Sequence, residues 1–249
     1  MRLRSRYGRA LLGCALVFMA GCAAEVYRSA DVVSPAQETS SRGKLGTQWG
    51  EGISSSVTNV NLRRLSPHAV DVVVVHYSSA NYQGQPVREA MLANGRIGFS
   101  IPGDRHTWEF TQDGRNLYLS GKEGERYQLS YRNYSDNTYE IVATVDGLDI
   151  LDGSPGALSH RGYVLYPRTT LQIEGFRKSQ DEVAAFRFSA PRDAYAANTD
   201  AGSPDNVGVI GTAVFELDVP RAPRPSPYSP QAFPEDAPGS YAPPPQYRR

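Results

Sequence analysis

The feature that most constrains the fold of this chain is the alternation of apolar and polar residues over short runs. Ile97, Phe99 and Ile101 alternate with Gly98 and Ser100, and residues 127–131 and 139–145 repeat the same period of two. Successive side chains of a β-strand point to opposite faces, so this period predicts strands with one buried face. Many such strands without alternating helices predict an all-β fold, an antiparallel β-sandwich or a relative of it.

Two runs, 70–77 and 207–217, are apolar on both faces and are therefore predicted to be central strands of the core. Turn chemistry separates the runs, because glycine and its Asn or Asp neighbour accept positive φ. These predicted turns are Asn94-Gly95, Asp113-Gly114, Asp146-Gly147 and Asp152-Gly153. One short helix is expected over residues 86–94, with proline in its first turn and glycine just after its end.

The domain organisation follows from composition. The charged, glycine-flanked stretch 121–124 is the best internal boundary, which gives a first β region over 46–124 and a second, sandwich-like one over 125–219. The two regions form either one β domain or two small ones. No internal repeat of fixed period accompanies them.

The N-terminus has the three parts of a signal peptide. Four arginines precede an apolar run over 10–20, and Met19-Ala20-Gly21-Cys22 follows. An apolar run of about eleven residues is too short for a transmembrane helix, which needs about twenty. The ending resembles the lipobox of bacterial lipoproteins, which implies cleavage after residue 21, lipid on Cys22 and attachment to a membrane. Ala23 follows the cysteine in place of the aspartate that favours inner-membrane retention in many such proteins, so an outer-membrane location is expected.

Cysteine and charge counts fit an exported protein. Cys14 lies in the cleaved segment and Cys22 would be acylated, so no disulfide is expected within one mature chain. The precursor has 26 basic and 26 acidic side chains; cleavage after residue 21 removes four arginines and no acids, which leaves 22 against 26, or minus four. This balance gives no indication of a nucleic-acid partner.

The two flanks have the composition of unfolded segments. Residues 22–45 lack a sustained apolar period and are expected to form a flexible tether. Residues 220–249 contain ten prolines and are expected to form a disordered tail that contributes little to stability. Matches to the PxxP pattern in this tail are as expected from its composition alone.

No catalytic motif occurs, neither G-x-S-x-G, H-E-x-x-H, C-x-x-C nor a Walker loop. The histidines lack metal-ligand spacing, and His76, at the end of an apolar run, is expected to be structural. Asp146, Asp149 and Asp152 recur every third residue, which differs from an EF-type calcium loop and is better explained by hairpin turns. No cofactor, no metal and no enzymatic activity are therefore expected.

The candidate binding loop is 189–206, the longest stretch without strand character. Loops of this length in compact domains are often functional. The candidate residues are Arg192, Asp193, Tyr195, Asn198 and Asp205. The alternative is that the tyrosine packs back on the sheet and the polar residues are simply solvated.

The second half also resembles a family of uncharacterised bacterial envelope proteins. The resemblance lies in VDGL, GYVL, GFRKS, DEVAAF and NVGVIG, at 145–148, 162–165, 175–179, 181–186 and 206–211, and in short matches at 45–47 and 49–51. It implies an exported β domain and brings no catalytic residues with it.

Three functions from different classes remain. The first is a lipid-anchored structural or interaction protein that docks another envelope component. The second is a small-ligand or glycan-binding module that uses exposed aromatic residues, including Trp49 and Trp108. The third, an enzyme with dispersed catalytic groups, has the least support. A flat apolar patch would favour the first, an aromatic cleft the second, and a pocket that pairs histidine with a carboxylate the third.

Overall fold

The computed structural model of the protein describes residues 43–114, 116–219, 231–232 and 241–247. These residues all belong to one compact unit. The predicted signal peptide, the lipidated Cys22 and most of the predicted tether lie outside the described residues.

Regular structure in the described part is almost entirely strand. The strands are β1 (Gly46–Ser54), β2 (Thr58–Asn59), β3 (Arg63–Arg64), β4 (Asp71–Ser78), β5 (Gln85–Val87), β6 (Ala90–Leu92), β7 (Ile97–Pro102), β8 (Thr107–Trp108), β9 (Phe110–Asp113), β10 (Asn116–Ser120), β11 (Arg126–Tyr127), β12 (Leu129–Asn133), β13 (Tyr139–Val145), β14 (Leu148–Asp149), β15 (Tyr163–Leu165), β16 (Thr170–Ile173), β17 (Gly175–Arg177), β18 (Glu182–Ser189), β19 (Val209–Asp218) and β20 (Gln231–Ala232). Three short 3₁₀ helices, η1 (Pro191–Asp193), η2 (Tyr195–Ala197) and η3 (Pro204–Asn206), lie between β18 and β19.

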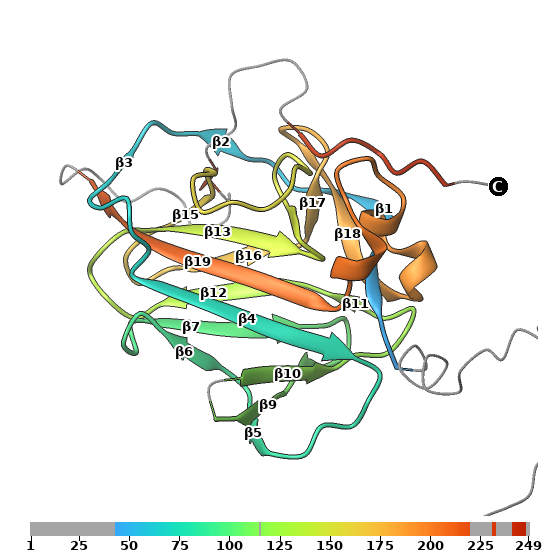
Figure 1. Cartoon of the computed structure of the whole chain (residues 1–249). Coiled ribbons are helices and arrows are strands. Elements are labelled where there is room, and N and C mark those ends of the chain that lie inside the picture. The colour runs from blue at the N-terminus through green and yellow to red at the C-terminus, as the bar shows by residue number, and fades with distance from the viewer. Residues whose placement is uncertain (1–42, 115, 220–230, 233–240, 248–249) are drawn as a thin grey trace, which may run out of the picture. The chain divides into compact units, whose positions relative to one another are not determined.

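The largest sheet has the order β2-β20-β15-β13-β19-β4-β10-β9-β5, with β14 on β13 and β3 on β19. Figure 1 shows its central strands β13, β19 and β4 side by side. Most neighbours are antiparallel, but β10 runs parallel to β4 and β2 runs parallel to β20. The predicted central strand 207–217 is confirmed as β19, which lies between β13 and β4.

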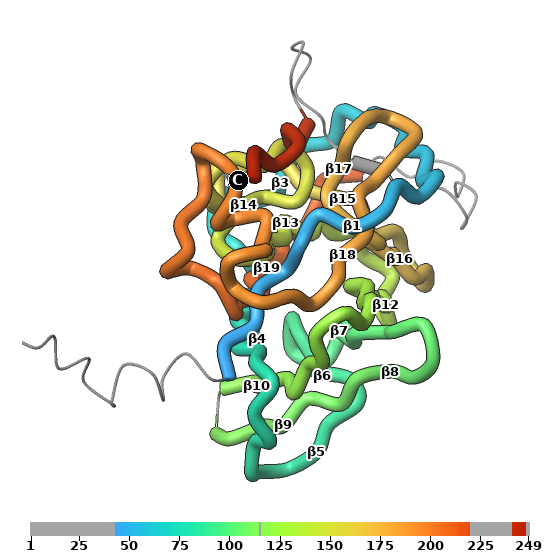
Figure 2. The backbone as a smooth tube through the Cα atoms, turned by 90° about the vertical axis from the view of Figure 1, so that its right-hand side faces the viewer, coloured from blue at the N-terminus to red at the C-terminus, as the bar shows by residue number. Residues whose placement is uncertain are grey.

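Two smaller sheets complete the fold. The five-stranded one has the order β16-β12-β7-β6 with β8 on β7, and the four-stranded one has the order β1-β18-β11 with β17 on β18. Figure 2 shows β1 crossing beside β18, two strands that come from opposite ends of the domain sequence. All three sheets combine strands from both sides of residue 124, where a turn leads from β10 to β11.

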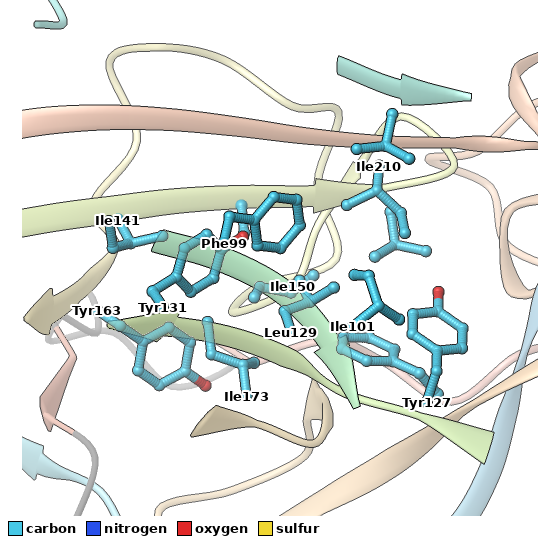
Figure 3. Packing of buried hydrophobic residues seen from close by; sticks show 14 of the residues in the cluster. Phe99, Ile101, Tyr127, Leu129, Tyr131, Ile141, Ile150, Tyr163, Ile173 and Ile210 are labelled. Atoms are coloured by element: carbon cyan, nitrogen blue, oxygen red, sulfur yellow. The ribbon is translucent and has the colours of Figure 1, made fainter. Parts of the chain in front are cut away.

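The core lies between the largest sheet and the five-stranded sheet (Figure 3). Phe99 and Tyr131 stack at 4.7 Å on neighbouring strands β7 and β12, opposite Ile210 of β19. The Tyr131 hydroxyl spans the layers to Thr212 Oγ1 at 2.7 Å, which satisfies two buried polar groups. The all-β, sandwich-like prediction is confirmed, because apolar faces of two sheets pack against each other.

The helix expected over 86–94 is wrong. This stretch contains β5 and β6, and its end is the tight turn between β6 and β7, where Ala93, Asn94 and Gly95 all have positive φ. Pro86 lies in an edge strand, where its missing N–H costs no ladder hydrogen bond. The proline is the middle residue of the three-residue strand β5, and the glycine closes a hairpin.

The predicted turn at Asp146-Gly147 joins β13 to β14, and both residues have positive φ. Gly95, Gly114 and Gly153 also have positive φ at the other predicted turns.

The tail differs from expectation in its described stretches. β20 pairs with β15 and β2, and Ala242 is buried, with its N–H donating to the carbonyls of Leu151 and Arg177. Prolines exclude regular sheet pairing over long runs but leave single N–H groups between them free to bond. These parts of the Pro-rich tail therefore pack on the domain.

Candidate functional site

The candidate site lies on the outer face of the largest sheet, the face turned away from the five-stranded sheet. Directly opposed residues of paired strands point to the same face, so the strand register defines which side chains lie together there. Two neighbouring outward rows, read from β13 through β19 to β4, are Val142, Ala213 and Val72, and Thr144, Gly211 and Val74. Neither row contains a charged residue.

One part of this outer face is covered by the chain between β2 and β4. Val142, Ala213 and Phe215 form a small apolar cluster with Ala69, separate from the main core. The guanidinium of Arg64 lies 3.6 Å from the centre of the Phe215 ring and forms an ion pair with the fully buried Glu140. Arg64 therefore closes this side of the face and supplies the charge that a buried carboxylate needs.

The cover stops at β4, and the apolar side chains beyond it are exposed. Val70, Val72 and Val74 are 41%, 55% and 44% exposed, although β4 is an interior strand of the sheet. Two more exposed residues, Leu65 and Leu158, border the same region, since Leu65 follows β3 and the Leu158 carbonyl accepts from Arg64. We call Leu65, Val70, Val72, Val74 and Leu158 the valine face.

This gathering is selective. Seven large hydrophobic residues are exposed in the described part of the chain, and five of them form the valine face. Exposed apolar residues scattered singly are ordinary, whereas a contiguous group marks a surface that another molecule covers.

Aromatic rings extend the valine face along β4. His76 points outward two residues after Val74 and lies opposite Tyr118 of β10, with ring centres 5.9 Å apart. Tyr82 stacks on Tyr118 at 4.7 Å, and its hydroxyl bonds to Ser78 Oγ. These rings give the uncharged surface a rigid aromatic end, a feature common at the centres of protein interfaces.

The predicted binding loop is divided between the core and the surface. Tyr195 is fully buried, with its ring 4.9 Å from that of Trp49 and 4.7 Å from that of Phe176, and its hydroxyl donates to the Pro243 carbonyl. Burial raises the pKa of Tyr195 to about 12. The tyrosine has thus packed back on the domain, where it is inaccessible to a partner.

The other residues of that loop lie nearer the surface. Arg192 and Asp193 are neighbours on η1 with 3.6 Å between their charged atoms, and Asp205 lies on η3. Asn198 donates to the Arg192 and Ala194 carbonyls, which fixes the turn between them. Arg192, Asp193 and Asn198 therefore lie together in the loop. Among the described residues, no contact joins them to the valine face.

The expected aromatic platform is not formed by the tryptophans. Trp49 and Trp108 are partly buried and pack against the main core. A shallow open cleft of about 460 Å³ adjoins Trp108 and is lined by Arg88, Glu89, Ser100, His106, Thr107 and Glu109. Within it Arg88 pairs with Glu109 at 2.7 Å, and the His106 ring packs on Trp108 at 4.3 Å. His106 is therefore not paired with a carboxylate in the described structure, so the cleft offers no acid–base pair.

A buried polar network that the sequence reading missed lies at the end of β13. Asp146 accepts from the backbone N–H groups of Thr47 and Gly208 and from the Tyr77 hydroxyl, at 2.6–2.8 Å. Thr47 Oγ1 also bonds to the Tyr77 and Tyr127 hydroxyls. Burial raises the pKa of Asp146 to about 6, although these hydrogen bonds oppose the shift. The network joins β1, β4 and the loop before β19, and its enclosure gives it a structural role.

Searches against protein-family models, curated proteins and solved structures find no match to this chain. Among the described residues no helix is long and apolar enough to cross a membrane.

The sequence contains a signal for the valine face in the run 70–77. The run 70–77 is apolar on both faces, which predicted burial on both faces. Its inward residues Val75 and Tyr77 are buried as expected, whereas Val72 and Val74 are exposed. Apolar side chains on the outer face of a strand indicate that another segment or molecule buries them. Here the chain between β2 and β4 covers part of the outer face but leaves β4 uncovered.

Proposed function

We propose that this chain is a lipid-anchored protein of the bacterial cell envelope, attached through Cys22 and resident in the outer membrane, that binds another envelope protein through the valine face. The anchor is supported by the lipobox resemblance at residues 19–22 and the location by Ala23. The interaction role is supported by one observation above all, the gathering of five of the seven exposed large hydrophobics of the described residues at the outer face of the largest sheet.

The chemistry of the face favours a protein over a small ligand. Small molecules bind in concave pockets with a few converging polar groups, whereas Val72 and Val74 lie in two neighbouring outward rows that contain no charged residue. β4 has strands on both sides, so a partner cannot add a strand to it and must dock side chains on the sheet face. Its expected surface is apolar, with polar groups at the margin near Arg63 and Asp218.

Photo-crosslinking tests this assignment in the intact lipoprotein. A photoreactive phenylalanine analogue replaces Val72, and its matched control replaces Met91, which is equally exposed at 52% but lies on β6 of the other sheet. Irradiation of intact cells should give one discrete protein adduct from position 72 and none from position 91. Equal adducts from both positions, or none from position 72, would overturn the proposed face.

The identity of the adduct separates two kinds of partner. An adduct of a different envelope protein supports the proposal, and mass spectrometry of the adduct names that protein. An adduct at twice the mass of this chain, containing only its own peptides, would show self-association and contradict a separate partner.

The anchor has its own test. Cys22→Ala removes the thiol that would be acylated, so metabolic labelling with a fatty-acid analogue should be lost while the protein is still made. Labelling that persists in Cys22→Ala would place the lipid elsewhere. Density-gradient fractionation that finds the wild-type chain only in the inner membrane would contradict the proposed location.

A further inference from the structure

Three carboxylates are buried in the described structure, and they differ in the cations and hydrogen-bond donors that contact them. Glu140 has the guanidinium of Arg64, and Asp146 accepts hydrogen bonds from several donors. Asp149 has one backbone donor, Leu151 N–H on Oδ1, while its Oδ2 has only the imidazole of His160 at 3.3 Å. A buried carboxylate usually has a cation or several hydrogen-bond donors as partners. Of the three, Asp149 has the fewest such partners.

A second carboxylate lies at the same place. One ligand atom each from Asp149, Asp152 and His160 lies within 4.8 Å of the others. Neither aspartate forms an ion pair with lysine or arginine within the described part of the chain. Two carboxylates and an imidazole thus converge without a lysine or arginine partner among the described residues.

We propose that Asp149, Asp152 and His160 form a binding site for a divalent transition-metal ion of the Zn²⁺ or Mn²⁺ class. Two ligands on one such ion, each about 2.0–2.2 Å from it, are roughly 3.0–3.4 Å apart, which the 3.3 Å between Asp149 Oδ2 and His160 Nδ1 matches. One imidazole with two carboxylates suits Zn²⁺ and Mn²⁺, whereas Ca²⁺ and Mg²⁺ prefer oxygen ligands alone.

The two aspartates are already oriented for this role. Leu151 N–H holds Oδ1 of Asp149, and Ser154 N–H and Oγ hold Oδ1 of Asp152 at 2.7–2.8 Å. Hydrogen bonds on one oxygen of each carboxylate fix the group and leave the second oxygen as a ligand, as outer-shell partners do in metal sites. The His160 side chain is 27% exposed, so the ion can reach the site from solvent and keep water as a further ligand.

The buried residue Arg177 lies near this cluster, since its backbone N–H donates to the Ile150 carbonyl. Its guanidinium donates to the Tyr163 hydroxyl and to the Ser55 carbonyl, and among the described residues no ion pair joins it to a carboxylate. A divalent ion bound by both carboxylates would supply the positive charge that no lysine or arginine of the described residues gives them.

Calorimetric titration of the full, untagged, chelator-stripped chain tests the site directly. Zn²⁺ and Mn²⁺ are each titrated, with Ca²⁺ and Mg²⁺ as comparison ions. One equivalent of Zn²⁺ or Mn²⁺ should bind, at least about tenfold more tightly than Ca²⁺ or Mg²⁺. His160→Ala, Asp149→Asn and Asp152→Asn should each weaken that binding by at least about tenfold.

The matched control is His106→Ala, which removes a surface imidazole outside the cluster and should leave the affinity unchanged. Far-UV circular dichroism checks that each variant is folded, and His160, being partly exposed, keeps the test decisive if Asp149→Asn fails to fold. Absence of binding at millimolar metal, or binding that survives His160→Ala unchanged, would overturn the proposal. Spectra of the Co²⁺-loaded chain give an independent readout, since loss of the imidazole ligand should shift the visible bands.

Discussion

The inner and outer faces of the largest sheet differ in how far their apolar side chains are buried, along the same strands. On the inner face Val145, Ile210 and Val75 form one row across β13, β19 and β4, and all three are fully buried. On the outer face the next row is Thr144, Gly211 and Val74, with the valine 44% exposed. One residue along each strand therefore separates the core from an apolar surface.

Apolar residues in a strand are buried only where another part of the chain covers them. On the inner face, burial is supplied by the second sheet, so composition and fold agree. On the outer face the cover consists of residues 58–69, which include Arg64, and it ends before β4. The valines beyond this cover are exposed, as the proposed binding role requires.

The largest expected effect comes from placing a charge on the inner face. Val75→Asp puts a carboxylate without a partner between β19 and β10, in a position with no exposure. We expect a loss of more than about 4 kcal/mol in the free energy of unfolding, a large share of the stability of a typical domain. Urea denaturation followed by far-UV circular dichroism measures it.

The neighbouring variant Val74→Asp is the matched control. It makes the same substitution on the outer face, where water solvates the charge, so we expect less than about 1 kcal/mol. Similar losses in both variants would show that the two faces are equally buried and would remove the distinction.

The next effect tests the edge of the cover. Arg64→Ala leaves the fully buried Glu140 without its cation, and we expect a loss of about 3–5 kcal/mol. Its sequence neighbour provides the control, because Arg63 is 83% exposed in its ion pair with Asp218 and Arg63→Ala should cost less than about 1 kcal/mol. Thermal and urea unfolding of both variants should separate them, and equal losses would refute the role given to Arg64.

A smaller effect depends on pH and concerns the inner network at Asp146. Burial raises the pKa of Asp146 from an ordinary 3.8 to about 6, so the folded state holds this proton more tightly than the unfolded state. The resulting stability is fully present below about pH 4 and is lost as pH rises through about 6. Asn cannot titrate, so the stability of wild type relative to Asp146→Asn should fall by about 2–3 kcal/mol between pH 4 and pH 7. Urea midpoints of both proteins across that range test this, and a difference that stays constant with pH would contradict the shift.

The smallest effect concerns the tail. Deletion of residues 241–249 removes the bonds of Ala242 to Leu151 and Arg177 and the bond of Pro243 to Tyr195, and should cost about 1–2 kcal/mol. Deletion of residues 248–249 alone serves as the control and should change nothing. If the longer deletion also leaves the melting temperature unchanged, the tail is dispensable, as its composition first suggested.

The fold was largely predictable because its rules are local. The period of two over 139–145 became β13, and Asp146-Gly147 became its turn with positive φ. The error at 86–94 arose where proline and glycine signals fit both a short helix and an edge strand followed by a hairpin. Only pairing with the distant β9 decided between the two, and that contact has no local signature.

The candidate sites were less predictable because they depend on distant parts of the chain. The exposure of Val72 follows from where residues 58–69 stop, which no pattern in 70–77 records. Likewise, Asp152-Gly153 forms a turn as predicted, whereas Asp149 lies in β14, and the approach of His160 to both depends on the return of the loop before β15. Tyr195 shows the converse, a residue of a polar loop that the core recruits.

The binding role proposed for the valine face is tested most directly by the double variant Val72→Lys/Val74→Lys. Its unfolding and its capture of the partner are measured in the same preparation. With Met91→Lys as the control, we predict a free energy of unfolding within about 1 kcal/mol of wild type. We also predict loss of the envelope protein identified by crosslinking from position 72. Retention of that protein by the folded double variant would contradict a binding role for the valine face, and a loss of stability above about 3 kcal/mol would show that the face belongs to the core.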